Sequence, residues 1–378
     1  KARGTDFVDY FFLVNLEDAT RSYNGTSWST STNVTSAPKA KYVESYRDRL
    51  YLLYCDVGGT VYSSRMYHSS LPASDGSITW DVANDWDYIE TNDGDVGKAL
   101  TKNGRYLIIF KEGSMHKFDG TYGATNLKPI SWEFGTVSQE SVVSDENLTL
   151  FYSRKGICAY MGGIPKLISR PIQPIIDRVN QSALGDIVAG ISGDYYYCYV
   201  GDLTSALEGD SAALEKVMLV YNINQNNWVY WTLADEPTCF GNYTSSGAKL
   251  LSFGDKNGEV FALNSGSKDD ISDIDTEVTF TMFPGGPETT NVFQNIFFFG
   301  NDHLGDLDFQ FQVDNSGTYS TAVDLADNYC KKHFADSNVD GFGRELTIKL
   351  SESGGTNQWR ISGVSVESEI GELETKES

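Results

Sequence analysis

The chain has 378 residues, with 29 lysines and arginines against 52 aspartates and glutamates, which gives a formal net charge of -23 at pH 7. Hydrophobic residues make up 40% of the chain and aromatic residues 13%, a composition that excludes disorder and suits one or two packed domains. The acidic excess excludes a protein that grips nucleic acid on a basic face, because the phosphates would be repelled.

Six hairpin patterns follow one another over residues 1–270. Each has two short runs of aromatic and β-branched residues, joined by a turn that contains Gly, Asn or Asp. A four-stranded propeller blade takes about 40–45 residues, which the shorter spacings fit and the longer ones exceed by insertions. The sequence predicts an all-β fold: a β-propeller of about six blades over 1–270, with the strand near Phe7–Val14 closing the ring against a late blade. The hairpins begin at Tyr10, Arg49, Tyr106, Leu148, Lys216 and Lys249.

One helix is predicted between the fourth and fifth hairpins, over residues 172–184. Its apolar residues recur at helical spacing, and Pro174 falls in the first turn, where proline is tolerated. The residues that carry this pattern are Ile172, Ile175, Ile176 and Val179.

The pattern changes after an acidic linker over residues 265–275. Six alternating strands follow, and in one of them Phe309 and Phe311 share a face opposite Asp308 and Gln310. Such strands predict a C-terminal antiparallel β-sandwich over 276–370, followed by a flexible tail over 371–378.

One sandwich strand, residues 291–300, has apolar residues on both faces, including Phe297, Phe298 and Phe299. Two apolar faces indicate burial on both sides, either inside the domains or at a contact between subunits. Phe298 is the candidate assembly contact, and burial inside the protein is the alternative.

Motifs for catalysis or cofactor binding are absent from the sequence. It contains no GxSxG, no GxxxxGK[ST] and no HExxH, and its five cysteines and four histidines lack the spacing of metal ligands. No run of about 18 apolar residues suggests a membrane span. The sequence therefore predicts no catalytic, cofactor-binding or metal site, no cofactor and no membrane partner.

Acidic pairs and acidic loops are the features of the sequence that most resemble a catalytic or metal site. Asp85 with Asp87, and Asp93 with Asp95, could be paired carboxylates, but 52 acids produce such pairs by chance at turns. The loops 93–97 and 254–259 carry oxygen ligands without the full spacing of a calcium loop, so hairpin turns are favoured.

Three tryptophans could stack on sugars: Trp132, Trp228 and Trp231. Packing between blades is the favoured interpretation, because a tryptophan at the end of a strand usually fills such a core.

Four segments in order resemble phrases of β-propeller virion proteins of tailed bacteriophages, the group that includes packaged-DNA stabilisation proteins and tail nozzle proteins. The likeness covers residues 10–180 and weakens beyond. The segments are NLEDATRSYNGTSW, YVESYRDRLYLLY with VYSSRMYHSS, DGDVGKALTKNGRYLIIFKEGSMHKFDGT, and GTVSQESVV with LFYSRKGICAYMGG.

The resemblance implies a non-enzymatic structural protein of the virion tail or neck, part of the tail or head-to-tail channel. Its implied partners are copies of itself in a ring and portal, adaptor or other tail proteins, with DNA passing transiently and without sequence-specific binding. The net negative charge suits such a conduit, because an acidic surface forms few attractive contacts with the phosphates of passing DNA. The alternative is a secreted carbohydrate-binding or glycoside-hydrolysing propeller.

Overall fold

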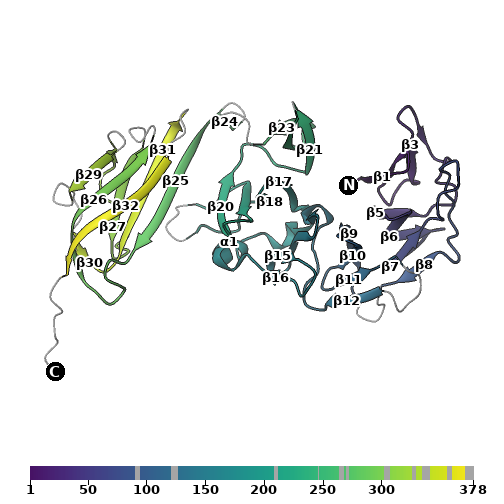
Figure 1. Cartoon of the computed structure of the whole chain (residues 1–378), viewed down its shortest axis with the longest axis horizontal. Coiled ribbons are helices and arrows are strands. Elements are labelled where there is room, and N and C mark those ends of the chain that lie inside the picture. Colours follow the sequence, from purple (N-terminus) through teal and green to yellow (C-terminus); the bar gives the residue numbers. More distant parts are fainter. Residues whose placement is uncertain are drawn as a thin grey trace, which may run out of the picture. The chain divides into compact units, whose positions relative to one another are not determined.

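The computed structural model divides the chain into two compact units, unit 1 (Lys1–Asn264) and unit 2 (Ser265–Ser378) (Figure 1). Both units are built from short antiparallel strands, so the predicted all-β class is confirmed. The structure describes residues 1–89, 94–120, 127–207, 212–245, 247–263, 268–269, 272–301, 307–325, 329–333, 341–355 and 360–370.

Unit 1 consists of six antiparallel sheets that follow one another in chain order, as Figure 1 shows. Five of them have four strands and the last has three within the described residues, and strands adjacent in sequence pair throughout. The first sheet contains β1 (Arg3–Phe7), β2 (Tyr10–Val14), β3 (Arg21–Tyr23) and β4 (Trp28–Ser29). The second contains β5 (Lys39–Tyr46), β6 (Arg49–Val57), β7 (Thr60–His68) and β8 (Trp86–Tyr88). The third contains β9 (Gly97–Asn103), β10 (Tyr106–Lys111), β11 (Met115–Phe118) and β12 (Leu127–Ser131). The fourth sheet contains β13 (Val143–Asp145), β14 (Leu148–Ser153), β15 (Gly156–Tyr160) and β16 (Lys166–Leu167). The fifth contains β17 (Val188–Ser192), β18 (Tyr195–Gly201), β19 (Val217–Asn222) and β20 (Asn227–Thr232). The sixth contains β21 (Cys239–Ser245), β22 (Ala248–Gly254) and β23 (Val260–Ala262).

The turn between β6 and β7 shows how local chemistry sets a hairpin. Gly58 and Gly59 both have positive φ angles, 61° and 89°, which two-residue hairpin turns require and which glycine adopts without strain. The Asp56 carboxylate accepts a 2.8 Å hydrogen bond from the Gly59 amide. The turn therefore follows from the sequence DVGGT alone.

Apolar residues of unit 1 form five cores, each shared by two consecutive sheets. The strands between two cores send alternate side chains to each. In β10, Leu107 and Ile109 enter the core shared with the second sheet, whereas Ile108 and Phe110 enter the core shared with the fourth. The same alternation occurs in β6, β14, β18 and β19. Burial on both faces explains why these strands are continuously apolar.

First strands of consecutive sheets lie against one another: β1 against β5, β5 against β9, β9 against β13, β13 against β17, and β17 against β21. Two glycines permit close approaches between neighbouring sheets. A Cβ on Gly97 of β9 would lie 2.8 Å from Leu53 of β6, and one on Gly190 of β17 would lie 2.9 Å from Phe240 of β21. The sheets could not pack this closely with any larger residue at those positions.

The strand near Phe7–Val14 does not join a late sheet, contrary to the prediction. The chain turns at Val8 and Asp9, so that β1 and β2 pair with each other and β3 pairs with β2. The backbone groups of β2 are thus used within the first sheet.

The predicted single helix over 172–184 is also wrong. The segment forms η2 (Arg170–Ile172), α1 (Gln173–Ile176) and η3 (Gln181–Asp186), and the remaining short helix of the described residues is η1 (Gln139–Ser141). Val179 instead forms a β-bridge with Leu203, and the Asn180 side chain accepts a hydrogen bond from the Ser182 amide, which starts a separate turn. None of the helices in the described part of the chain is long and apolar enough to cross a membrane.

Unit 2 has two antiparallel sheets that share one apolar core. The first contains β24 (Lys268–Asp269), β25 (Ser272–Met282), β31 (Leu346–Gly355), β27 (Asp308–Val313) and β28 (Val323–Asp324) in spatial order. The second contains β26 (Asn291–Asn301), flanked by β29 (Tyr329–His333), β30 (Phe342–Gly343) and β32 (Arg360–Ile370). Strands β24 and β25 thus begin inside the predicted linker. The tail predicted over 371–378 lies outside the described residues.

Phe298 on β26 lies inside this core with 0% of its surface exposed, and its ring meets that of Phe309 at 4.9 Å between centroids. A side chain without exposed surface cannot meet a partner unless the unit rearranges. Phe299, which is 42% exposed, is the neighbouring aromatic that a partner could reach. A β-bulge between Phe293 and Asn295 shifts the alternation, so that Phe293 and Phe298 both face the core.

Candidate functional site

Charged side chains gather where the first strands of the first three sheets meet. We call this group the first-strand cluster: Arg3, Lys41, Glu44, Lys98, Lys102 and Glu140. Arg3 lies on β1, Lys41 and Glu44 lie on β5, and Lys98 and Lys102 lie on β9. Glu140 is supplied by η1, which precedes the fourth sheet.

Arg3 connects the first sheet to the element before the fourth. Its Nε lies 2.7 Å from Oε1 of Glu140, and both side chains are less than a fifth exposed. Nε has no aligned hydrogen-bond partner, so this contact is an electrostatic one. Nη1 donates a 3.1 Å hydrogen bond to the carbonyl of Lys41, and the guanidinium lies 4.7 Å above the ring of Tyr42. Arg3 is therefore held by charge, backbone and ring contacts together.

Lys41 is the cation of the cluster that forms no ion pair within the described residues. Its Nζ lies 5.5 Å from the ring centroid of Tyr42 and 5.2 Å from that of Tyr54. Tyr54 has a φ of 58° at a β-bulge in β6, a strained conformation that redirects its side chain. Burial lowers the pKa of Lys41, and the positive charges of Lys98 and Arg3 add to that effect.

Glu44 links the first three sheets. Its Oε1 lies 3.4 Å from Lys102 Nζ of β9, and it accepts hydrogen bonds from Thr5 Oγ1 of β1 (3.4 Å) and from the Ser45 amide (3.0 Å). Burial raises the pKa of Glu44, although Lys102 and these hydrogen bonds oppose the shift. Burial also raises the pKa of Tyr42 to about 12, so this hydroxyl stays protonated near neutral pH.

Lys98 completes the cluster from β9. Its Nζ lies 3.1 Å from Oε2 of Glu112, whose other carboxylate oxygen pairs with Arg154 of the turn after β14. The cluster thus offers three paired cations and one cation held by tyrosine rings. Among the described residues, no three His, Cys, Asp or Glu side chains are arranged to hold a metal ion.

The acidic loops that the sequence singled out act as turns where they are described. The Asp95 carboxylate accepts hydrogen bonds from the amides of Val96, Glu112 and Gly113 at 2.7–3.0 Å. The Asp255 carboxylate does the same for its own loop, accepting from Asn257 (2.9 Å) and Glu259 (2.8 Å). Asp93 lies outside the described residues.

The other singled-out residues are dispersed. Burial raises the pKa of Asp87, and His68 opposes that shift.

Two of the three tryptophans fill space between sheets. Trp228 packs on Tyr221 at 4.6 Å between ring centroids and donates a 3.2 Å hydrogen bond to the Ile168 carbonyl. Trp231 packs on Tyr197 at 5.7 Å between ring centroids. Trp132 is 57% exposed and stands edge-on to His116.

Sequence reasoning missed the first-strand cluster. The available signal was local: charged residues in runs that otherwise have the composition of buried strands, such as KAKYVESY and GKALTKN. What it lacked was the knowledge that these strands lie side by side.

No protein-family model matches the sequence, and no curated protein is similar to it in sequence. Among solved structures, exo-beta-1,3-galactanase from Phanerochaete chrysosporium is similar with a TM-score of 0.30 and 11% identity, over 97% of this chain and 95% of that one. A glycoside hydrolase has a TM-score of 0.27 and 12% identity over 85% and 96% of the two chains. The computationally designed Ika4 protein has a TM-score of 0.29 and 12% identity over 46% and 93%. Similarities this low carry no argument about function.

Proposed function

We propose that unit 1 is a six-bladed β-propeller and unit 2 a β-sandwich, and that the chain is a non-enzymatic structural protein of tailed-bacteriophage virions. The observation that carries the architecture is the alternation of β6, β10, β14, β18 and β19 between two cores. Face-to-face stacking of small sheets around a common centre produces this pattern, since each inner sheet is buried on both sides.

The phage role rests on the sequence resemblance, whose four segments coincide with successive sheets. The first segment runs from the residue after β2 to the first residue of β4, and the second covers β5 to β7. The third runs through β9 to β11, and the fourth covers η1 to β15. The four similar segments occur in the same order as the first four sheets. This order supports common descent of the blades better than scattered matches would.

Charge pairing supports a conduit that DNA passes without being held. Arg3, Lys98 and Lys102 of the first-strand cluster each face a carboxylate, and the chain as a whole carries a charge of -23. Cations already paired in this way offer few sites to phosphates, so a moving duplex meets little resistance. Ring copies and portal, adaptor or other tail proteins are the proposed partners, in the tail or neck of the virion.

The decisive experiment is mass spectrometry of purified virions of the encoding phage, combined with immunogold labelling. We expect the chain in stoichiometric amounts and the label at the tail or neck. Virions that lack the chain would overturn the phage role. Electron microscopy of the purified chain at high concentration tests the ring independently.

Glycoside binding or hydrolysis at the first-strand cluster is a second candidate, favoured by the raised pKa of Glu44. A raised carboxyl pKa is one feature of a glycosidase general acid. Release of reducing sugar from a polysaccharide panel, abolished by Glu44→Gln but not by Glu236→Gln, would favour this candidate. No release by the unmodified chain would reject hydrolysis.

A further inference from the structure

Arg65 on β7 lies in an aromatic box. Its guanidinium carbon is 3.7 Å from the ring centroid of Tyr62, 4.1 Å from that of Trp86 and 4.6 Å from that of Tyr88. Trp86 and Tyr88 also contact each other edge-to-face at 4.8 Å. Three rings around one guanidinium restrict its position through cation–π contacts.

The hydrogen bonds of Arg65 leave donors available. Nη1 donates to the Tyr67 hydroxyl at 3.2 Å and Nη2 donates to the Tyr88 hydroxyl, while Nε is buried without a partner. A guanidinium has five N–H donors, so each terminal nitrogen keeps one for a ligand. Within the described residues Arg65 forms no ion pair, which is notable in a chain with 52 acidic residues. No carboxylate of the described residues pairs with its charge.

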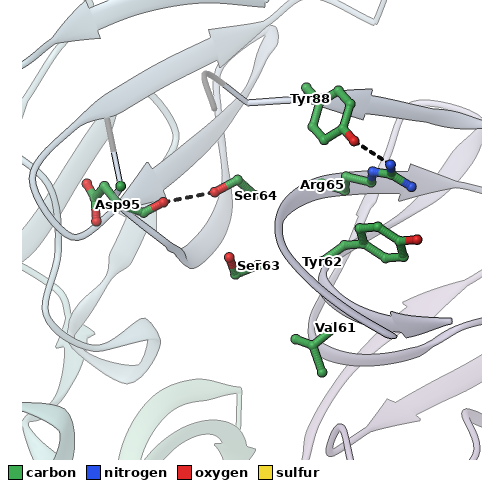
Figure 2. A pocket seen from close by; sticks show the side chains of 8 residues that line it. Val61, Tyr62, Ser63, Ser64, Arg65, Tyr88 and Asp95 are labelled. Carbon is green, nitrogen blue, oxygen red and sulfur yellow. Dashed lines mark hydrogen bonds between the residues drawn. The ribbon is translucent and has the colours of Figure 1, made fainter. Parts of the chain in front are cut away.

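Arg65 lines a hollow of about 300 Å³, at the small end of the range for ligand pockets. Figure 2 shows Arg65 and Tyr88 on one side of it and Ser64 and Asp95 on the other. Ser63, Ser64, Tyr62, Val61 and Gly94 complete the lining. The Ser64 hydroxyl donates to the Asp95 carbonyl at 2.9 Å, which leaves its oxygen able to accept from a ligand hydroxyl. The Tyr88 ring is 47% exposed.

The charge of the hollow selects among anions. Arg65 supplies one positive charge. The Asp95 carboxylate supplies one negative charge, and it accepts hydrogen bonds from three backbone amides. A dianionic phosphate would be repelled more strongly by Asp95 than a monoanionic carboxylate would. The two remaining terminal N–H groups match the two oxygens of a carboxylate.

The hydroxyl groups select among carboxylates. An acidic peptide side chain would use the guanidinium and bring no hydroxyl for Ser63 or for the Ser64 oxygen. A sugar acid brings a carboxylate together with ring hydroxyls for the serines and C–H groups for the exposed Tyr88 ring. We propose that the Arg65 pocket binds the carboxylate of an acidic monosaccharide unit, such as a uronic acid.

The test is isothermal titration of the full chain with D-glucuronate, D-glucose, glucose 6-phosphate and tetraglutamate. We expect glucuronate to bind and the other three to bind at least about tenfold more weakly. Glucose lacks the charge-assisted contact, tetraglutamate lacks the ring hydroxyls, and glucose 6-phosphate is repelled more strongly by Asp95. The proposal would be overturned if glucose bound as tightly as glucuronate or if tetraglutamate bound more tightly than glucuronate. It would also be overturned if glucuronate did not bind.

Arg65→Gln should weaken glucuronate binding by about tenfold or more, because the bidentate donor pair is lost. Arg105→Gln is the matched control, since Arg105 also lies over a tyrosine ring, Tyr106 at 5.6 Å, but does not line the pocket. Ser63→Ala, which leaves the aromatic box intact, should weaken binding by about fivefold with unchanged thermal stability. Wild-type affinity in both Arg65→Gln and Ser63→Ala would overturn the assignment.

Discussion

Units 1 and 2 are both antiparallel β-structures, but they bury their strands differently. The inner strands of unit 1 are covered on both faces, so β10 (YLIIFK) is almost continuously apolar. In unit 2, β27 (DFQFQV) sends Phe309, Phe311 and Val313 into the core and places Asp308 and Gln310 on the other face. The two sequence patterns report how many neighbours a sheet has rather than which fold it belongs to.

The difference has a consequence for stability. In unit 1 each core joins two sheets, and each inner sheet belongs to two cores, so damage to one core reaches the sheets on both sides. Unit 2 depends on a single core. Calorimetry of the full chain should therefore resolve two transitions, and core substitutions should move only the transition of their own unit.

Phe298→Asp should have the largest effect and abolish the transition of unit 2. The substitution places a carboxylate in a fully buried site, a change that costs several kcal/mol at least. Phe299→Asp, one residue along β26 and 42% exposed, is the matched control and should leave both transitions nearly unchanged. A folded Phe298→Asp chain that fails to enter particles would instead make Phe298 an assembly contact.

Phe110→Ala should lower the free energy of unfolding of unit 1 by about 3–5 kcal/mol, the usual cost of removing a buried phenylalanine ring. Phe110 of the third sheet meets Phe151 of the fourth at 4.9 Å between ring centroids. A double-mutant cycle with Phe151→Ala should give a coupling energy of about 0.5–1.5 kcal/mol. Independent effects of the two substitutions would argue against a core shared by these sheets.

Gly97→Ala should destabilise unit 1 by about 1–3 kcal/mol, because the new methyl group would collide with Leu53 of the neighbouring sheet. Gly163→Ala is the control, since no atom lies within 4 Å of its Cβ position. Adding Leu53→Ala to Gly97→Ala should cost less than the sum of the two single changes. Chemical denaturation monitored by tryptophan fluorescence measures all three.

The smallest effect concerns pH. Burial raises the pKa of Glu44, so the folded state of unit 1 binds this proton more readily than the unfolded state does. The resulting penalty is present above the raised pKa and disappears as the pH falls through it to the ordinary value near 4.5. Glu44→Gln should therefore gain stability relative to the wild type at neutral pH and lose that advantage in acid. Thermal melts at several pH values measure this, with the unit 2 transition as the internal control.

The sequence alone determined that the chain is built from strands and that β27 has one apolar and one polar face. Alternating and continuous apolar runs express local burial, and the DVGGT turn needs only its own residues to form. The same local logic failed for residues 172–184, where a bridge from Val179 to Leu203 and the cap at Asn180 outweighed helical periodicity. Propensity over so short a segment is too small to resist such contacts.

Only the tertiary structure decided which charged groups meet. Arg3, Lys41, Lys98 and Glu140 come from three strands and a short helix far apart in the sequence, and they converge because first strands lie against first strands. The Arg65 pocket also needs Asp95, which lies in the loop just before β9 of the third sheet. Sequence periodicity reports the face on which a residue lies, but the identity of the group opposite it depends on how the sheets stack.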